Sequence, residues 1–160
     1  MTKALASVKN VTSYRVIYGD TDQMGVVYYA NYLRWFESGR SELLRQIGLP
    51  YGKIEEQGFH FPVTEVSCRY AQSARYDEVV KIETELSSLG RATLVFNYHV
   101  SRESDGTLLA TGSTRHACID QAGRLSRIPK TLENALNVRD QRADGRWQIA
   151  DRRNSRSDLP

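Results

Sequence analysis

Two segments in the middle of the chain alternate between apolar and polar side chains, and this alternation limits what the chain can fold into. Val80, Ile82 and Leu86 alternate with charged residues in the segment 78–87, and the segment 92–102 repeats the pattern. Side chains of a β-strand point to opposite faces of a sheet with a period of two. Each segment is therefore predicted to be a strand that has one buried face.

Three more strands and one long helix are predicted. The strands are expected over residues 12–18, 59–71 and 107–120. Between residues 29 and 47, apolar side chains recur three or four positions apart on one face, and Gly48 ends the run. Successive strands joined by short turns, such as Asp105-Gly106, pair antiparallel. The predicted fold class is therefore α+β, with an antiparallel sheet and one long helix lying across it.

The predicted sheet has more apolar surface than one helix covers. Another copy of the chain can cover the remaining surface, so we expect a homo-oligomer, either a dimer or a tetramer built from two dimers. The 160 residues fit one domain. We assign residues 1–136 to this domain and residues 137–160, which contain few apolar side chains, to a charged C-terminal extension.

Composition excludes several classes of protein. The formal charge of +3 arises from interspersed charges of both signs, which does not indicate nucleic-acid binding. No stretch approaches the ~18 apolar residues of a membrane span, and the N-terminus lacks the apolar core of a secretory signal, so we expect a cytoplasmic protein. Cys68 and Cys118 lack metal-ligand spacing and are predicted to be buried free thiols. We expect neither a metal nor another cofactor.

The segment 18–32 places two carboxylates between the first strand and the helix. Asp20 and Asp22 precede Gly25, a residue that can adopt the backbone angles of a tight turn. A helix start exposes unpaired N–H groups and the positive end of the helix dipole. The segment therefore offers a carboxylate beside a site that can bind an oxyanion.

Two other interpretations of these aspartates were considered. Asp20, Asp22 and Gly25 match three positions of an EF-hand calcium loop, but Met24 and Asn31 stand where calcium ligands are required. Calcium is therefore excluded. The spacing alone favours a second interpretation, in which both aspartates are turn or helix-capping residues.

Several short motifs accompany the aspartates. They are Tyr18-Gly-Asp-Thr-Asp, Gly25-Val-Val-Tyr-Tyr, Arg34-Trp-Phe-Glu-Ser-Gly-Arg40, Gly48-Leu-Pro50, Phe61-Pro-Val63 and Tyr70-x-x-x-Ala-Arg-Tyr-Asp77. Together they resemble the 4-hydroxybenzoyl-CoA thioesterase family, and specifically its YbgC-like acyl-CoA thioesterase branch. The resemblance runs from about residue 12 to residue 128, and it outweighs the capping interpretation.

The resemblance implies a hotdog fold, in which an antiparallel sheet wraps around one long helix, with active sites at a dimer interface. It implies hydrolysis of an acyl-CoA or acyl-carrier-protein thioester, with Asp22 as the catalytic carboxylate and the Tyr29 backbone N–H as the oxyanion donor. Such a carboxylate either attacks the carbonyl or activates water, and the sequence leaves this choice open. Asp20 is interpreted as structural, and Asn31 as a residue that fixes the helix start.

Seven residues are expected to contact the substrate: Gly25, Val27, Tyr28, His60, Glu65, Arg75 and Arg91. The two arginines are candidates for the CoA phosphates. His60 and Glu65 are candidates for reaching the pocket from a neighbouring strand.

Two alternatives stay open. A hotdog hydratase or dehydratase would need a histidine paired with an acid near the helix, and no histidine precedes His60. A non-catalytic acyl-binding or interaction protein would usually lack the motif aspartate. Acyl length, aromatic against aliphatic preference, and CoA against acyl carrier protein are not determined by the sequence.

Overall fold

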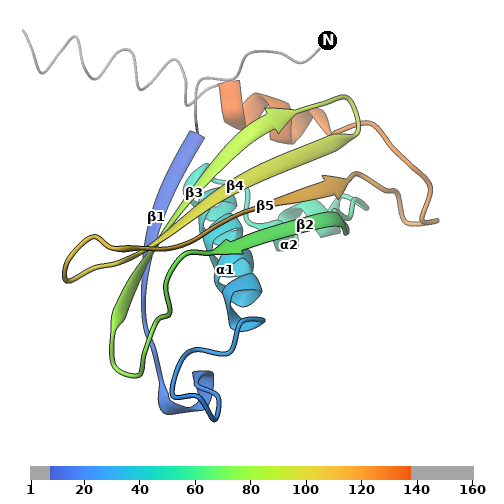
Figure 1. Ribbon diagram of the computed structural model, residues 1–160. Helices are drawn as coiled ribbons and strands as arrows, with labels where there is room; N and C mark the ends of the chain where they lie inside the picture. The colour runs from blue at the N-terminus through green and yellow to red at the C-terminus, as the bar shows by residue number, and fades with distance from the viewer. Residues whose placement is uncertain (1–7, 138–160) are drawn as a thin grey trace, which may run out of the picture.

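The computed structural model describes residues 8–137 and shows one sheet with a long helix against it (Figure 1). In chain order the elements are β1 (Val8–Arg15), the short 3-10 helix η1 (Tyr18–Asp20), α1 (Asn31–Gln46), α2 (Tyr51–Glu56), β2 (Val63–Tyr70), β3 (Val79–Leu89), β4 (Thr93–Arg102) and β5 (Leu108–Ala117). Residues 130–137 are also helical. The predicted α+β class is confirmed.

The five strands form one antiparallel sheet in the order β1-β3-β4-β5-β2. β1 pairs with β3, so that Arg15 at the end of β1 lies opposite Val79 at the start of β3. β2 is separated from β1 in sequence by both helices, and it joins the far edge of the sheet beside β5, with Tyr70 opposite Ala110. The two strands that flank the helices in sequence therefore form the two edges of the sheet.

The alternation in the central strands is confirmed, because it sorts their side chains between the two faces. Val80, Ile82 and Leu86 of β3 are buried, whereas Lys81 and Glu83 between them are exposed. Full burial of such an aliphatic side chain contributes about 1.5–3 kcal/mol.

The helix α1 packs on the sheet through a contact that requires a glycine. The ring of Phe36 stacks on the ring of Tyr98 in β4, with centroids 4.2 Å apart and planes 7° from parallel. A Cβ atom at Gly112 of β5 would lie 2.5 Å from the Phe36 ring and 2.5 Å from the Ser67 carbonyl oxygen. The absence of a side chain at Gly112 therefore permits the close approach of α1 to the sheet.

Several boundaries differ from the prediction. β1 ends at Arg15 rather than residue 18, because the side chain of Asp20 accepts a hydrogen bond from the Ile17 N–H and draws the chain into η1. α1 begins at Asn31 rather than residue 29. The helix α2 was not predicted, because its six residues bury only Ile54 and form no amphipathic repeat.

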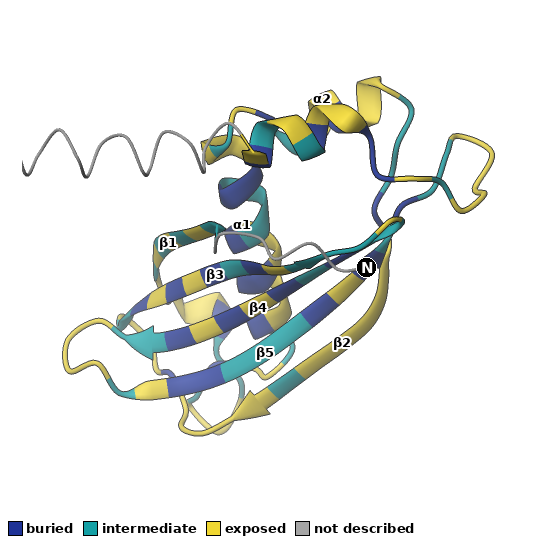
Figure 2. Ribbon diagram, turned by 90° about the horizontal axis from the view of Figure 1, so that it is seen from above, coloured by how far each residue is buried: buried dark blue, intermediate teal, exposed yellow. Residues whose placement is uncertain are grey.

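The edge strand β2 is largely exposed (Figure 2). Its apolar side chains Val63, Val66 and Tyr70 are 46%, 50% and 44% exposed. An unpaired edge with apolar side chains is a surface that pairs readily with another strand.

Three further predictions concern the chain as a whole. Within the described residues, Cys68 and Cys118 are free thiols as predicted, but only Cys118 is buried, whereas Cys68 on the edge strand β2 is half-buried. No helix in residues 8–137 is both long and apolar enough to cross a membrane. The charged extension predicted from residue 137 lies, apart from Asn137, outside the described residues.

Candidate active site

The turn after η1 has Asp22 at its beginning. The Asp22 N–H donates a hydrogen bond of 2.9 Å to the Val26 carbonyl, and the Gly25 N–H donates one of 3.0 Å to the Asp22 carbonyl. Gly25 has a φ angle of +76°, a conformation that other residues rarely adopt. The tight turn predicted at Gly25 is confirmed.

The carboxylate of Asp22 is only partly used by this turn. Asp22 is half-buried, and its Oδ1 accepts a hydrogen bond of 2.9 Å from the Met24 N–H. An aspartate stabilises a turn through this kind of contact. The turn-capping role predicted for Asp22 therefore applies to its Oδ1. No group within residues 8–137 donates a hydrogen bond to the other oxygen, Oδ2, which is therefore available to a ligand or to water.

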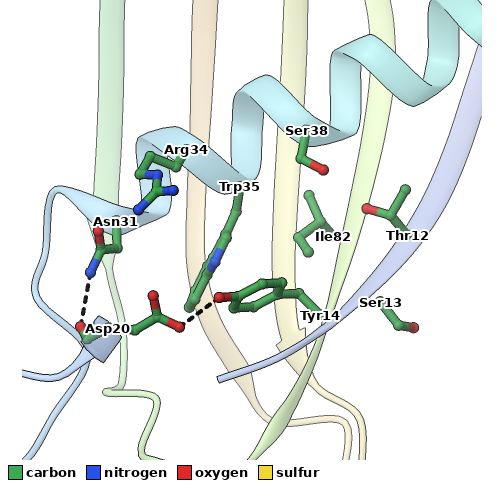
Figure 3. Close-up of a pocket in the computed structure, with 9 residues that line it drawn as sticks. All are labelled: Thr12, Ser13, Tyr14, Asp20, Asn31, Arg34, Trp35, Ser38 and Ile82. Carbon is green, nitrogen blue, oxygen red and sulfur yellow. Dashed lines mark hydrogen bonds between the residues drawn. The ribbon is translucent and has the colours of Figure 1, made fainter. Parts of the chain in front are cut away.

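Asp20, by contrast, is a structural residue that is only 5% exposed. Its Oδ2 accepts hydrogen bonds from the Tyr14 hydroxyl at 2.8 Å and from the Ile17 N–H at 2.9 Å. Its backbone carbonyl accepts from the Tyr28 N–H at 2.9 Å. The same carbonyl accepts from Asn31 Nδ2 at 2.8 Å (Figure 3). Asp20 thus ties β1 to the start of α1, and Asn31 fixes the helix start as expected.

Tyr29 lies just before α1, and its N–H has no acceptor in the described part of the chain. The N-cap residue, Ala30, offers no side-chain cap, and the Asn31 N–H donates to the Tyr28 carbonyl at 2.9 Å. Unpaired N–H groups at a helix start carry the positive end of the helix dipole. The Tyr29 backbone can therefore donate a hydrogen bond to an oxygen on which negative charge develops.

The loop between β2 and β3 closes the other side of this site. The Val27 N–H donates to the Ala74 carbonyl at 2.9 Å, and the Ala74 N–H donates to the Tyr32 hydroxyl at 3.2 Å. Tyr70, the last residue of β2, donates its hydroxyl proton to the Tyr29 carbonyl at 2.9 Å. Burial, as the largest cause, raises the pKa of both Tyr32 and Tyr70, so both hydroxyls remain protonated at neutral pH.

Four of the predicted substrate contacts lie at this end of the molecule. Gly25 and Tyr28 are exposed in the segment that leads to α1, and Arg75 follows Ala74 in the adjoining loop. Val27 is also here, but its side chain is buried in the core.

The structure does not bring His60 or Arg91 together with Asp22 within one chain. Asp22 follows β1, whose end lies beside the start of β3, whereas Arg91 follows the end of β3. The eleven residues of β3 span roughly 33 Å, at about 3.3 Å for each step from one residue to the next. His60 precedes β2 at the same distant end, and its Nδ1 lies 3.5 Å from Glu55 Oε1.

Glu65 lies on the exposed edge strand β2. Its carboxylate forms an ion pair of 3.5 Å with Arg115 on the neighbouring strand β5. Both side chains are well exposed, so the pair contributes little to stability.

A cavity of about 180 Å³ lies between β1 and the first turns of α1 (Figure 3). It is lined mainly by polar side chains, among them Tyr14, Asp20, Asn31 and Arg34. Asp22 is not part of this lining, so the cavity is distinct from the open turn that carries the candidate catalytic carboxylate.

A second cavity, of about 260 Å³, lies near the end of α1 and contains a histidine with no predicted role. Arg40, whose partner the sequence does not identify, lines it together with His116. His116 is buried, with Nδ1 3.0 Å from the Phe61 carbonyl oxygen and Nε2 2.8 Å from Thr114 Oγ1. Burial, with a smaller contribution from the Arg40 charge, lowers its pKa. It is a packed, hydrogen-bonded histidine.

Comparisons with known proteins agree with this fold. The profile of the Thioesterase-like superfamily matches residues 16–136. The acyl-CoA thioesterase YbgC of Haemophilus influenzae is 34% identical over 126 residues, which cover 77% of this chain and 90% of the relative. The 4-hydroxybenzoyl-CoA thioesterase of a Pseudomonas species is 30% identical over 95 residues, 58% of this chain and 67% of the relative.

A solved structure extends the agreement to three dimensions. The DHNA-CoA thioesterase of Staphylococcus aureus superposes with a TM-score of 0.76 at 32% identity, over 86% of this chain and 95% of that one. The expected hotdog fold is therefore confirmed. Because the family profile covers nearly all described residues, the chain belongs to the Thioesterase-like superfamily, and its resemblance to the YbgC and 4-hydroxybenzoyl-CoA thioesterases is confirmed.

Proposed function

We propose that the chain hydrolyses an acyl-CoA thioester, or an acyl group carried on acyl carrier protein, to the free acid and thiol. One observation carries the proposal: Asp22, a carboxylate with one oxygen that receives no hydrogen bond within residues 8–137, precedes a helix start at which the Tyr29 N–H has no acceptor among the same residues. The turn that carries Asp22 is held against the helix start that carries Tyr29, because the carbonyl of Asp20 accepts hydrogen bonds from the start of α1. Membership of the Thioesterase-like superfamily and the names of the relatives support it.

The chemistry requires only these two groups at the reacting carbonyl. The Tyr29 N–H donates to the carbonyl oxygen of the thioester and stabilises the negative charge that develops there. In one route Asp22 attacks the carbonyl carbon, the thiolate leaves, and water hydrolyses the resulting anhydride. In the other route Asp22 takes a proton from water, which attacks directly. Both routes yield the acid and the thiol, and both require an ionised Asp22.

The proposed substrate contacts follow from position. Tyr28 and Gly25 flank the acyl group beside Asp22, and Val27 supports the turn through its N–H bond to Ala74. Arg75 is proposed to pair with a CoA phosphate, because a guanidinium forms strong charge-assisted hydrogen bonds with phosphate oxygens. One relative is named for acyl-CoA in general and another for 4-hydroxybenzoyl-CoA. The choice between aliphatic and aromatic acyl groups is therefore left to experiment.

The exposed edge strand suggests how the remaining candidates reach the site. A twofold axis beside an edge strand pairs that strand antiparallel with its own copy. Such a pairing of β2 would bring the start of the partner's β2 towards Tyr70 and the Asp22 turn. It would place His60 of the partner subunit near the site. Glu65 and Arg91 of the partner subunit lie at the same end of the partner's sheet as His60. We therefore propose a homodimer formed through β2, with a tetramer as its further assembly.

The state of assembly can be measured by light scattering. The wild type at micromolar concentration is expected to give the mass of a dimer or tetramer. Val66→Lys, which adds a charge to the exposed edge, is expected to shift it towards monomer. A monomeric wild type would reject the proposed assembly.

The proposed activity is tested by thiol release from short, long and aromatic acyl-CoAs and from an acyl carrier protein. Asp22→Asn should lower turnover by at least about a hundredfold. Its amide oxygen can still accept from the Met24 N–H, so the turn and the thermal melt should be unchanged. Asp120→Asn is the matched control, because Asp120 accepts from the Ala122 N–H in the same way at 2.9 Å.

Each outcome of this assay has a clear meaning. Equal turnover in Asp22→Asn and the wild type would return Asp22 to a turn-capping role. Tight acyl-CoA binding without hydrolysis would point to the non-catalytic alternative.

A further inference from the structure

Tyr70 contacts the one backbone residue on which the proposed reaction most depends. Its hydroxyl donates a hydrogen bond of 2.9 Å to the carbonyl oxygen of Tyr29, which lies 41 residues earlier in the chain. Tyr70 is the last residue of β2, whereas Tyr29 lies just before α1. The bond therefore ties the edge of the sheet directly to the helix start.

The position of the Tyr70 hydroxyl is set by aromatic packing. The Tyr70 ring stands edge-on to the ring of Tyr32, with centroids 5.1 Å apart, and to that of Tyr29, at 6.4 Å. The raised pKa of Tyr70, caused first by burial and then by its neighbour Cys68, keeps the hydroxyl protonated and able to donate. Tyr32 is itself held, because its hydroxyl accepts from the Ala74 N–H at 3.2 Å.

The hydrogen bond matters because Tyr29 lies outside the regular helix. The peptide group on its N-terminal side carries the Tyr29 N–H, which has no acceptor among residues 8–137, and the carbonyl of that group, from Tyr28, accepts from the Asn31 N–H. The peptide group on its C-terminal side is held by Tyr70. With both peptide planes fixed, the backbone of Tyr29 cannot rotate, and its N–H points in one direction. An oxyanion donor is effective only when it is oriented before the reaction begins.

We propose that Tyr70 is a positioning residue for thioester hydrolysis: its hydroxyl fixes the Tyr29 backbone so that the Tyr29 N–H faces the thioester carbonyl. This role rests on the proposed function, and it adds a residue of β2 to the proposed site. Tyr70 touches neither the carbonyl nor the thiol, and it acts through the orientation of Tyr29.

The test is Tyr70→Phe, which removes the hydroxyl and keeps the ring that packs on Tyr32. With the acyl-CoA that the wild type hydrolyses best, kcat should fall about tenfold while KM changes less than twofold. Loss of a whole oxyanion donor costs about a hundredfold or more, and a misdirected donor loses part of that. Turnover is measured per folded molecule, well below the melting temperature of each variant.

Tyr76→Phe is the matched control, because Tyr76 is an exposed tyrosine of the adjoining loop whose hydroxyl has no partner in residues 8–137. It should retain the kcat of the wild type. A role confined to stability would lower the melting temperature of Tyr70→Phe and leave its kcat unchanged, which would overturn the proposal. A raised KM at constant kcat would also overturn it, because it would make Tyr70 a binding residue.

The two proposals fail separately. If Asp22→Asn is inactive and Tyr70→Phe is as active as the wild type, the positioning role is wrong and the thioesterase function stands. If the wild type hydrolyses none of the thioesters, the function is wrong and the role of Tyr70 is lost with it.

Discussion

Tyr14 donates its phenolic proton to Asp20 across 2.8 Å, joining the end of β1 to the turn that precedes the candidate active site. The same carboxylate oxygen of Asp20 accepts from the Ile17 N–H. Because Asp20 is buried, both hydrogen bonds are strong, and the loss of either would lower the free energy of unfolding. Of the two aspartates of the motif, this one shapes the loop, whereas Asp22 is the one that the proposed function assigns to the reaction.

Asp20→Asn is therefore expected to lower stability more than turnover. Removing the charge weakens two hydrogen bonds to a buried carboxylate, so the free energy of unfolding should fall by about 1–2 kcal/mol. Urea unfolding measures this loss. Tyr14→Phe removes the hydroxyl that donates one of the two hydrogen bonds, so it should show part of the same loss in the free energy of unfolding. An Asp20→Asn variant with full stability and no turnover would show that Asp20 takes part in the reaction.

Gly112→Ala should destabilise the fold through one misplaced methyl group. The new Cβ would lie 2.5 Å from both the Phe36 ring and the Ser67 carbonyl oxygen, so the helix must move from the sheet. We expect a loss of about 1–3 kcal/mol in the free energy of unfolding, measured with urea. Gly52→Ala is the control, because its site in α2 is open, and it should be neutral or more stable by about 0.5–1 kcal/mol. Equal stability of the two variants would contradict the close packing at Gly112.

His116 is expected to make the fold less stable in mild acid. Its Nδ1 lies 3.0 Å from the Phe61 carbonyl oxygen, which can only accept, and its Nε2 lies 2.8 Å from the Thr114 hydroxyl, which can donate, so both contacts fit a neutral ring. Burial lowers its pKa below the ordinary value of 6.5. Below pH 6.5 the unfolded chain binds a proton that the folded chain does not, so the free energy of unfolding should fall as the pH drops from 6.5 towards the folded-state pKa.

The measurement is urea unfolding at several pH values between 8 and 5. His116→Gln, although less stable overall, should lose this part of the pH dependence. A variant with the same slope as the wild type would assign the acid sensitivity to other groups.

Deleting residues 139–160 should leave thioester hydrolysis within about twofold of the full chain. The family profile ends at residue 136, and Leu132 and Leu136, the last buried side chains of the part of the chain that the structure describes, are retained. Steady-state kinetics on both forms with one acyl-CoA tests the prediction, with thermal melts to compare their folding. A folded but inactive truncated protein would place the extension in the active site.

The sequence by itself determined the local structure and the candidate chemistry. Alternation in β3 and β4 and the helical period of α1 follow from the geometry of each element, so short stretches such as Val80–Leu86 reveal them. The turn at Gly25 and the position of Asp22 before the helix could also be predicted, because both depend on neighbouring residues alone. The short helix α2 could not, since its six residues have no periodic pattern.

Only the tertiary structure decided which distant residues meet. Nothing in the local pattern indicates that β2 joins the sheet beyond β5, and this order is what places Tyr70 against Tyr29. It also separates His60 and Arg91 from Asp22 by the length of a strand, although all three were predicted for one site. Contacts between residues far apart in sequence depend on strand order and register, which the packing of the whole chain selects and no short segment encodes.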